Sequence, residues 1–111
     1  KKPKTKLKCT PIIKNMGWCD DVNDKKNYNR LININKKNKI KYEKMYRKNN
    51  NYDLVIPIKF NYKKTKLGKG SAIFIHLTKN YQRTAGCIAL KKKDFLILIK
   101  LINKNTKIKI T

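Results

Sequence analysis

Hydrophobic and polar positions alternate most regularly in the second half of the chain, where several strands are expected. Residues 70–77 (GSAIFIHL) predict a strand with two distinct faces. One face carries Ala72, Phe74 and His76, and the other carries Ile73, Ile75 and Leu77. Residues 52–60 (YDLVIPIKF) are apolar and β-branched and predict a buried strand, in which Pro57 favours an edge or a bulge. Residues 86–90 (GCIAL) predict a short extended segment.

A helical period then replaces the alternation. Residues 91–103 predict the principal helix. Its apolar positions follow the i, i+3, i+4, i+7 spacing of one buried face: Phe95, Leu98, Ile99 and Ile102. Residues 41–48 (KYEKMYRK) predict a shorter helix with two tyrosines and a methionine on one face. The alternation in residues 106–110 (TKIKI) predicts a half-buried closing strand.

The first third of the chain is less regular. Residues 15–29 are rich in Asn and Asp and predict an ordered loop around Trp18, because a Trp side chain is costly to leave in water. A short extended piece is expected over residues 31–34. Residues 1–14 form a basic N-terminal segment that begins as a frayed end or an edge strand, ahead of a main domain at 15–111. The expected fold is mainly β, with one or two helices.

Length and composition fit one folded domain. The chain has 111 residues, and a hydrophobic fraction of 40% argues against full disorder. The longest apolar run, residues 95–99, is far shorter than the roughly 20 residues that a transmembrane helix needs. The basic start is not followed by the apolar core of a secretory signal peptide. Because the first residue is Lys1 rather than Met, we expect a processed chain or a fragment.

The formal charge of +24 points first to polyanions. However, Lys supplies 27 of the 30 basic residues, and Lys, Asn and Ile together make half of the chain. All three have A/T-rich codons, so codon usage explains much of the charge. Arg, the residue that reads bases bidentately, is scarce. We therefore do not expect nucleic acid as the partner; a solvated surface or retention on an anionic wall polymer fits diffuse lysines better.

His76 and Cys87 are the candidate pair for chemistry. His76 is the only histidine, at the end of an apolar strand, and Cys87 follows eleven residues later, directly after Gly86. An imidazole that takes the thiol proton makes the sulfur a good nucleophile. Backbone N–H groups around Gly86 and Cys87 would suit a developing oxyanion. The alternative from the residues alone is a core histidine and an inert buried thiol.

The two other cysteines leave the redox state open. Cys9 and Cys19 either pair in an oxidising compartment or stay free. If they pair, Cys87 is left as the one reactive thiol. The spacing of the cysteines lacks the CxxC pattern of zinc sites, so neither a metal nor another cofactor is expected.

The runs GSAIFIHL (70–77) and TAGCIAL (84–90) together resemble the L,D-transpeptidase (YkuD-type) catalytic domain. Upstream blocks at 17–21 (GWCDD), 28–30 (YNR) and 52–62 resemble the pieces that precede the active site in one branch of that family. The resemblance covers roughly residues 15–110. It implies a β-sandwich with one late α-helix, and because the family's early strands are largely missing, it implies N-terminal truncation.

The resemblance also implies roles and a substrate. Cys87 would be the nucleophile and His76 the general base and acid, while Thr84 and Gly86 match the nucleophile motif. The backbone carbonyl of Leu77 would orient the histidine ring. The substrates would be peptidoglycan stem peptides, whose acyl group forms a Cys thioester and passes to an amine or to water. The implied enzyme is a cofactor-free acyltransferase, expected to be monomeric, in the periplasm or cell wall of a bacterium.

The chain departs from the common family motif in three ways. The gap between the histidine and the cysteine is short, Ala85 replaces a second histidine, and Ala89 replaces a polar residue. The last change removes a usual contact to the substrate carboxylate, for which Arg83 is a candidate replacement. A further set of residues either lines the substrate cleft or forms a self-satisfied Asx-rich loop: Trp18, Asp20 and Asp21.

Two other function classes stay open beside the transpeptidase interpretation. One is a Cys-dependent peptidoglycan carboxypeptidase or amidase, which would pass the acyl group to water. The other is a basic polyanion-binding module that has lost catalysis. Reaction with a thiol-reactive β-lactam separates the enzymes from the binding module, and an amine acceptor separates transfer from hydrolysis.

Overall fold

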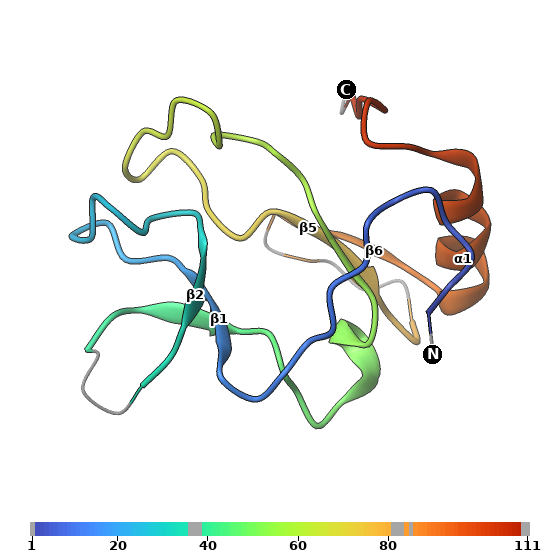
Figure 1. The fold of residues 1–111 in the computed structure, drawn as a ribbon, viewed down its shortest axis with the longest axis horizontal. Coiled ribbons are helices and arrows are strands. Elements are labelled where there is room, and N and C mark those ends of the chain that lie inside the picture. Colours follow the sequence, from blue (N-terminus) through green and yellow to red (C-terminus); the bar gives the residue numbers. More distant parts are fainter. Residues whose placement is uncertain (1, 36–38, 81–83, 85, 110–111) are drawn as a thin grey trace.

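The computed structural model describes residues 2–35, 39–80, 84 and 86–109, which form two three-stranded sheets and one α-helix (Figure 1). In the first sheet, strand β1 (Met16–Cys19) lies between β2 (Leu31–Asn33) and β3 (Tyr42–Lys44), and both pairings are antiparallel. The glycine of β1 lets the neighbours pack closely. A Cβ at Gly17 would lie only 2.7 Å from the side chain of Ile34.

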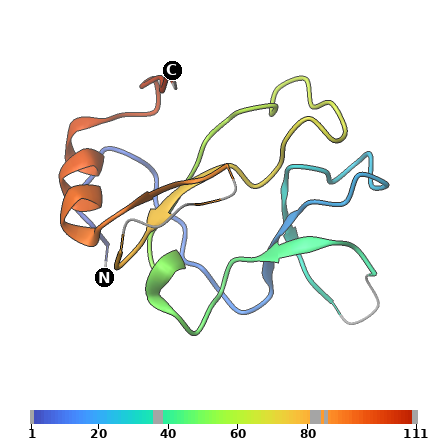
Figure 2. The ribbon, with the colours of Figure 1, turned by 180° about the vertical axis from the view of Figure 1, so that it is seen from behind.

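The second sheet carries the later half of the chain. Strand β5 (Phe74–Leu77) lies between β4 (Val55–Pro57), which is antiparallel to it, and β6 (Ile88–Leu90), which is parallel to it. A short 3-10 helix, η1 (Asn50–Tyr52), precedes β4, and helix α1 (Lys92–Leu101) follows β6. The rear view shows α1 and the first sheet at opposite ends of the molecule, with the second sheet between them (Figure 2).

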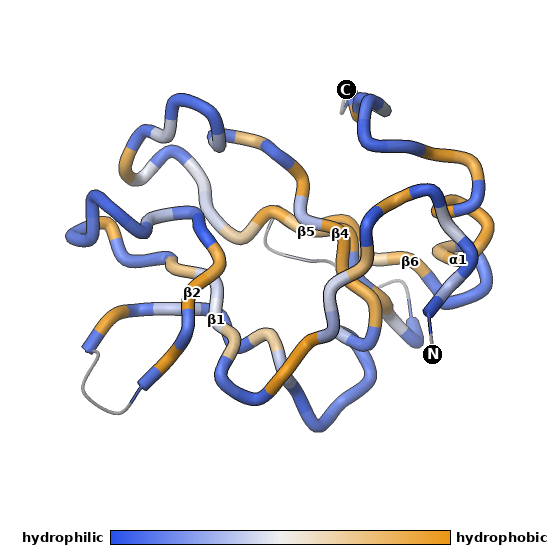
Figure 3. The backbone as a smooth tube through the Cα atoms, viewed as in Figure 1, coloured by the Kyte–Doolittle hydropathy of each residue, from blue (hydrophilic) through white to orange (hydrophobic). Residues whose placement is uncertain are grey.

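The alternation in β5 divides the core into two clusters. The strand predicted over 70–77 forms only over 74–77, since Ala72 lies at φ +58°, and within the strand the predicted faces are confirmed. Phe74 packs toward the first sheet with Ala72, Trp18, Met45 and Tyr52. The opposite face packs on the helix through a second cluster: Ile75, Leu77, Phe95 and Ile99. Apolar segments meet along β4, β5 and α1 in the hydropathy view (Figure 3). Strand β5 is therefore the central element, and its two faces have different partners.

The principal helix and the short extended segments are where the sequence predicts them. Helix α1 buries Phe95 and Ile99, carries Asp94 in its first turn and ends at Leu101, slightly before the predicted boundary. The strand predicted over 52–60 is shorter, because η1 occupies its start and the strand ends at Pro57, a residue without a backbone donor. The fold is mainly β with one late helix, as expected. None of the helices in the described part of the chain is long and apolar enough to cross a membrane.

Four predictions about local structure are wrong. Residues 42–44 form strand β3 and no helix. The hydrogen bonds and packing gained by pairing with β1 stabilise this short segment more than its weak helical pattern would. The predicted loop at 15–29 contains β1. Residues 106–109 form no strand, although polar and apolar residues alternate there. No strand among the described residues pairs with this segment to bury its apolar side, and Ile108 is 46% exposed.

The fourth concerns the N-terminal segment, which is not an edge strand over residues 2–8. It crosses the helix instead: the Thr5 hydroxyl donates a hydrogen bond of 2.6 Å to the carbonyl of Ile99 in α1. Further along, Ile12 packs against the cluster of Trp18 and Phe74. The segment therefore contacts both clusters rather than extending a sheet.

Candidate active site

The parallel pairing of β5 and β6 brings the two candidate catalytic residues onto one face of the second sheet. Ile75 is paired with Ile88 and His76 with Ala89, so Cys87, two residues before Ala89, follows the same side of the pleat as His76. Both residues face the first sheet: Cys87 packs against the cluster of Trp18 and Phe74, and His76 contacts Tyr52 of that cluster.

The ring of His76 is half-buried and held on two sides. Its Nδ1 atom lies 2.9 Å from the carbonyl oxygen of Leu77. A carbonyl only accepts hydrogen bonds, so Nδ1 carries the proton and the lone pair of the neutral ring is on Nε2. The ring of Tyr52 lies 5.3 Å from the imidazole, centroid to centroid, at an interplanar angle of 43°. This arrangement fixes the tautomer that a general base needs.

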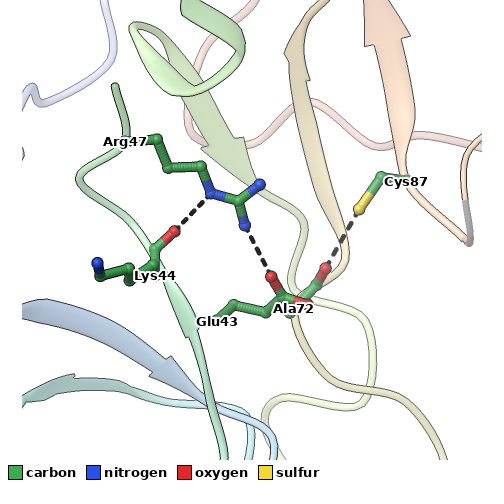
Figure 4. Close-up of polar contacts among 5 residues, drawn as sticks. All are labelled: Glu43, Lys44, Arg47, Ala72 and Cys87. Carbon is green, nitrogen blue, oxygen red and sulfur yellow. Dashed lines mark hydrogen bonds and ion pairs between the residues drawn. The ribbon is translucent and has the colours of Figure 1, made fainter. Parts of the chain in front are cut away.

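The Cys87 thiol is half-buried and donates a hydrogen bond to the carbonyl oxygen of Ala72, with Sγ and O 3.3 Å apart (Figure 4). The Thr84 hydroxyl donates to the carbonyl of Cys87 itself, directly before β6. Gly86 has φ +89°, a conformation that residues with a side chain rarely adopt. The hydrogen bond from Thr84 and the conformation of Gly86 thus both lie next to the nucleophile candidate.

Asn29 is a positioning residue that the sequence did not single out from its block. It is buried at φ +60°, and its Oδ1 accepts hydrogen bonds from Trp18 Nε1 (2.9 Å) and from the backbone N–H of Ala72 (3.3 Å). Its Nδ2 donates to the carbonyls of Phe60 and Asn61. Apart from Gly, Asn is among the residues that best tolerate the left-handed backbone. This preference is the sequence feature that could have marked Asn29. Through Ala72, it supports the carbonyl that Cys87 contacts.

Trp18 is part of the buried core. Its side chain is 7% exposed, packs edge-on against Phe74 with ring centroids 5.2 Å apart, and gives its N–H to Asn29. The indole is thus packed and hydrogen-bonded within the core, which favours the structural one of the two interpretations, and its contact with substrate stays a prediction.

Asp20 and Asp21 lie in the turn after β1, and their carboxyl groups differ. Burial raises the pKa of Asp20, against the opposing effect of Lys41. Hydrogen bonds from the backbone N–H groups of Asn23 and Lys41 lower the pKa of Asp21. Asp21 thus closes an Asx turn within its own loop. This agrees with the interpretation of residues 15–29 as a self-satisfied Asx-rich loop.

The remaining candidates are placed as follows. Arg83 and Ala85 lie outside the described residues, and Ala89 is half-buried in β6. Cys9 and Cys19 are free thiols, and burial raises the pKa of Cys19. Over the described ranges, no group of three or more His, Cys, Asp or Glu side chains is arranged to hold a metal ion.

The sequence comparisons identify one family. The family model of the L,D-transpeptidase catalytic domain, YkuD, matches residues 5–110. Neither the curated proteins nor the solved structures gave a significant match. Because the family match covers nearly the whole chain and includes both β5 and the segment before β6, the chain belongs to the YkuD family of L,D-transpeptidase catalytic domains.

Proposed function

We propose that the chain is a peptidoglycan acyltransferase that forms a thioester on Cys87, with His76 as general base and acid. The observation that carries the proposal is the register of β5 and β6, which puts Cys87 and His76 on one sheet face beside Tyr52. The Nδ1 contact of His76 with the Leu77 carbonyl supports the role of Nε2 as the proton acceptor. The family acts on cell-wall peptidoglycan, which implies a location outside the cytoplasm.

In the first half-reaction, His76 takes the thiol proton and the sulfur attacks the carbonyl carbon that precedes a terminal D-alanine. The tetrahedral intermediate carries an oxyanion, and the backbone N–H groups near Gly86 and Cys87 are the candidates to hold it. The C–N bond then breaks, and the imidazolium returns its proton to the departing amine. The products are free D-alanine and an acyl-Cys87 thioester.

In the second half-reaction, an acceptor amine attacks the thioester carbonyl. His76 takes a proton from the attacking nitrogen, the C–S bond breaks and the thiolate of Cys87 is regenerated and reprotonated. A new amide bond between two stem peptides is the result. Water in place of the amine gives a carboxylic acid, which is the carboxypeptidase outcome.

The resting hydrogen bond of Cys87 bears on the first step. Because the Ala72 carbonyl accepts from a protonated sulfur, forming the thiolate gives up this bond. The proposed step therefore requires the thiol to leave the Ala72 carbonyl and approach the imidazole. Substrate binding is the event expected to favour the second position.

The proposal is tested by acylation with a carbapenem, a β-lactam that reacts with active thiols. We expect one adduct on the folded protein, mapped by mass spectrometry to Cys87 and absent from Cys87→Ser. Cys9→Ser and Cys19→Ser are the matched controls and should keep the adduct. An adduct that maps to Cys9 or Cys19, or none on folded protein, contradicts the proposal. A tetrapeptide donor with and without an amine acceptor then separates transfer from hydrolysis.

A further inference from the structure

Arg47 carries a fixed positive charge close to the candidate site. Its guanidinium carbon lies 3.7 Å from the centre of the Tyr52 ring, and that ring is 5.3 Å from the ring of His76. The sum of these distances, about 9 Å, is an upper limit for the separation of the guanidinium from the imidazole. Tyr52 therefore links a cation on the segment after β3 to the proposed base on β5.

Electrostatics at Tyr52 agree with this placement. Burial raises the pKa of the Tyr52 hydroxyl, the charge of Arg47 lowers it, and the charges of Glu43 and of a Cys87 thiolate raise it. Arg47 and Cys87 therefore both lie near the Tyr52 side chain.

The guanidinium is held in place without using all of its donors. Arg47 Nε donates to the carbonyl of Lys44 over 2.8 Å, and one terminal nitrogen donates to a carboxylate oxygen of Glu43 over 2.8 Å (Figure 4). A guanidinium has five N–H groups, so these two contacts leave three for a ligand. Glu43 has a side chain 41% exposed, and such exposed pairs are weak, so a second carboxylate can share the cation.

Arg47 is also one of only three arginines in a chain with 27 lysines. A lysine ammonium would carry the same charge as Arg47. It could not stack flat on the Tyr52 ring and at the same time donate several hydrogen bonds in the plane of a guanidinium. The planar fork is the group that binds carboxylates bidentately. The chemistry of the position therefore suits a carboxylate better than a neutral group.

We propose that Arg47 binds the free α-carboxylate of the terminal residue of the acyl donor, the residue that leaves as the thioester forms. The inference rests on the proposed function. That carboxylate lies one residue beyond the scissile carbonyl, and consecutive Cα atoms are about 3.8 Å apart. A carbonyl beside Cys87 and His76 thus places the carboxylate within reach of a cation no more than about 9 Å from the imidazole.

The test compares two donor peptides that differ only at the terminus, a free acid and its amide, in several variants. The wild type should prefer the acid. Arg47→Met keeps apolar cover on Tyr52 and should lower kcat/KM for the acid by about 10- to 100-fold, while the amide changes little. Arg47→Lys should keep part of the preference. Equal losses for both donors in Arg47→Met overturn the proposal and leave Arg47 a structural role.

Glu43→Gln is the matched control because it breaks the ion pair but leaves the cation. We expect it to keep or strengthen the preference for the acid. If it reproduces the effect of Arg47→Met, the ion pair supports the fold and the proposal is wrong. Binding of both peptides to Cys87→Ala, measured by calorimetry, reads the preference without turnover. The carboxylate site can therefore be tested even if the proposed chemistry fails. Equal binding of the acid and the amide to Cys87→Ala rejects the carboxylate site.

Discussion

The thiol of Cys87 donates its hydrogen bond to Ala72, a residue that itself lies in the left-handed region at φ +58°. Non-glycine residues pay roughly 1–2 kcal/mol for that conformation. The surrounding structure maintains it, since Asn29 accepts the Ala72 N–H. The direction of the Ala72 carbonyl, and with it the resting position of the thiol, therefore depends on a backbone conformation set by contacts with the first half of the chain.

Substitutions at Ala72 should separate backbone strain from packing. Ala72→Val adds β-branching to a left-handed residue and should destabilise the fold by about 2 kcal/mol and slow carbapenem acylation. Ala72→Gly loses a buried methyl, worth about 0.8 kcal/mol, but gains freedom at positive φ, so its stability should stay within about 1 kcal/mol of wild type. Urea unfolding followed by the fluorescence of Trp18 measures both. A glycine variant as unstable as the valine variant would contradict the strained conformation.

Asn29→Ala should be among the most destabilising single changes in the chain. It leaves the indole N–H of Trp18 and the carbonyls of Phe60 and Asn61 without their partner, at a cost of at least about 3 kcal/mol. Urea unfolding at neutral pH gives the free energy difference.

Asn29→Asp is the matched variant, because it keeps the acceptor for Trp18 but turns a donor into an oxygen that faces two carbonyls. It should be unstable at pH 7 and partly recover at pH 4, where a protonated carboxyl can donate. An aspartate variant that is stable at pH 7 would show that the amide donor contributes little.

The elements that the sequence predicts well are those whose pattern matches one consistent environment. In β5, every second residue faces the same cluster, so the alternation alone separates Phe74 from Ile75. In α1, the buried positions Phe95 and Ile99 are four residues apart on one face. The resemblance of the segments around His76 and Cys87 to a known family added the candidate site, because these residues stand in two compact motifs.

The parts of the fold and of the candidate site that the sequence did not predict depend on contacts that residue spacing does not encode. Residues 42–44 are too few to show a period of their own, and pairing with β1 decides their conformation. The stack of Arg47 on Tyr52 beside His76 joins three residues from different elements. Nothing in the apolar run at 52–60 marks Tyr52 as the residue between a cation and a base.

Replacing either of two glycines by alanine should lower the stability of the fold, but for different reasons. At Gly86, a Cβ would meet Ile73 at an ordinary 3.6 Å, so only the φ of +89° opposes Gly86→Ala, at about 1–2 kcal/mol. Because this residue precedes Cys87, acylation by a carbapenem should also slow. At Gly17, a Cβ would lie 2.7 Å from Ile34, so the cost of Gly17→Ala comes from packing in the first sheet.

A second substitution distinguishes the two causes. Ile34→Ala removes both atoms nearest to the new Cβ, Cδ1 and Cγ1, so Gly17→Ala should cost less stability in that background than in the wild type, measured by urea unfolding. Ile73→Val should restore nothing in Gly86→Ala. The acylation rate of folded Gly17→Ala should equal that of wild type, and a slow rate there would mean that the first sheet positions the nucleophile more directly than its contacts indicate.

Asp20 and Asp21 are adjacent carboxyl groups that should affect stability in opposite directions with pH. The pKa of Asp20 is raised by burial, so its ionisation opposes folding as the pH rises from 3.8 through the folded value. The pKa of Asp21 is lowered by the N–H groups of Asn23 and Lys41, so its stabilising effect is present above 3.8 and is lost as the pH falls through the folded value. Each residue is the control for the other, because they share one loop and one solvent.

Asp20→Asn should therefore raise the melting temperature at pH 7, whereas Asp21→Asn should lower it. The Asp20 difference should shrink as the pH falls through the raised folded pKa toward 3.8, and the Asp21 difference only as the pH falls below 3.8, because protonation then removes the same charge from the wild type. Thermal unfolding at a series of pH values measures the differences, and carboxyl chemical shifts in an NMR titration give the order in which the two groups ionise. If Asp20 ionises at the lower pH, burial does not control it, and the turn after β1 holds its carboxylates differently from the arrangement described above.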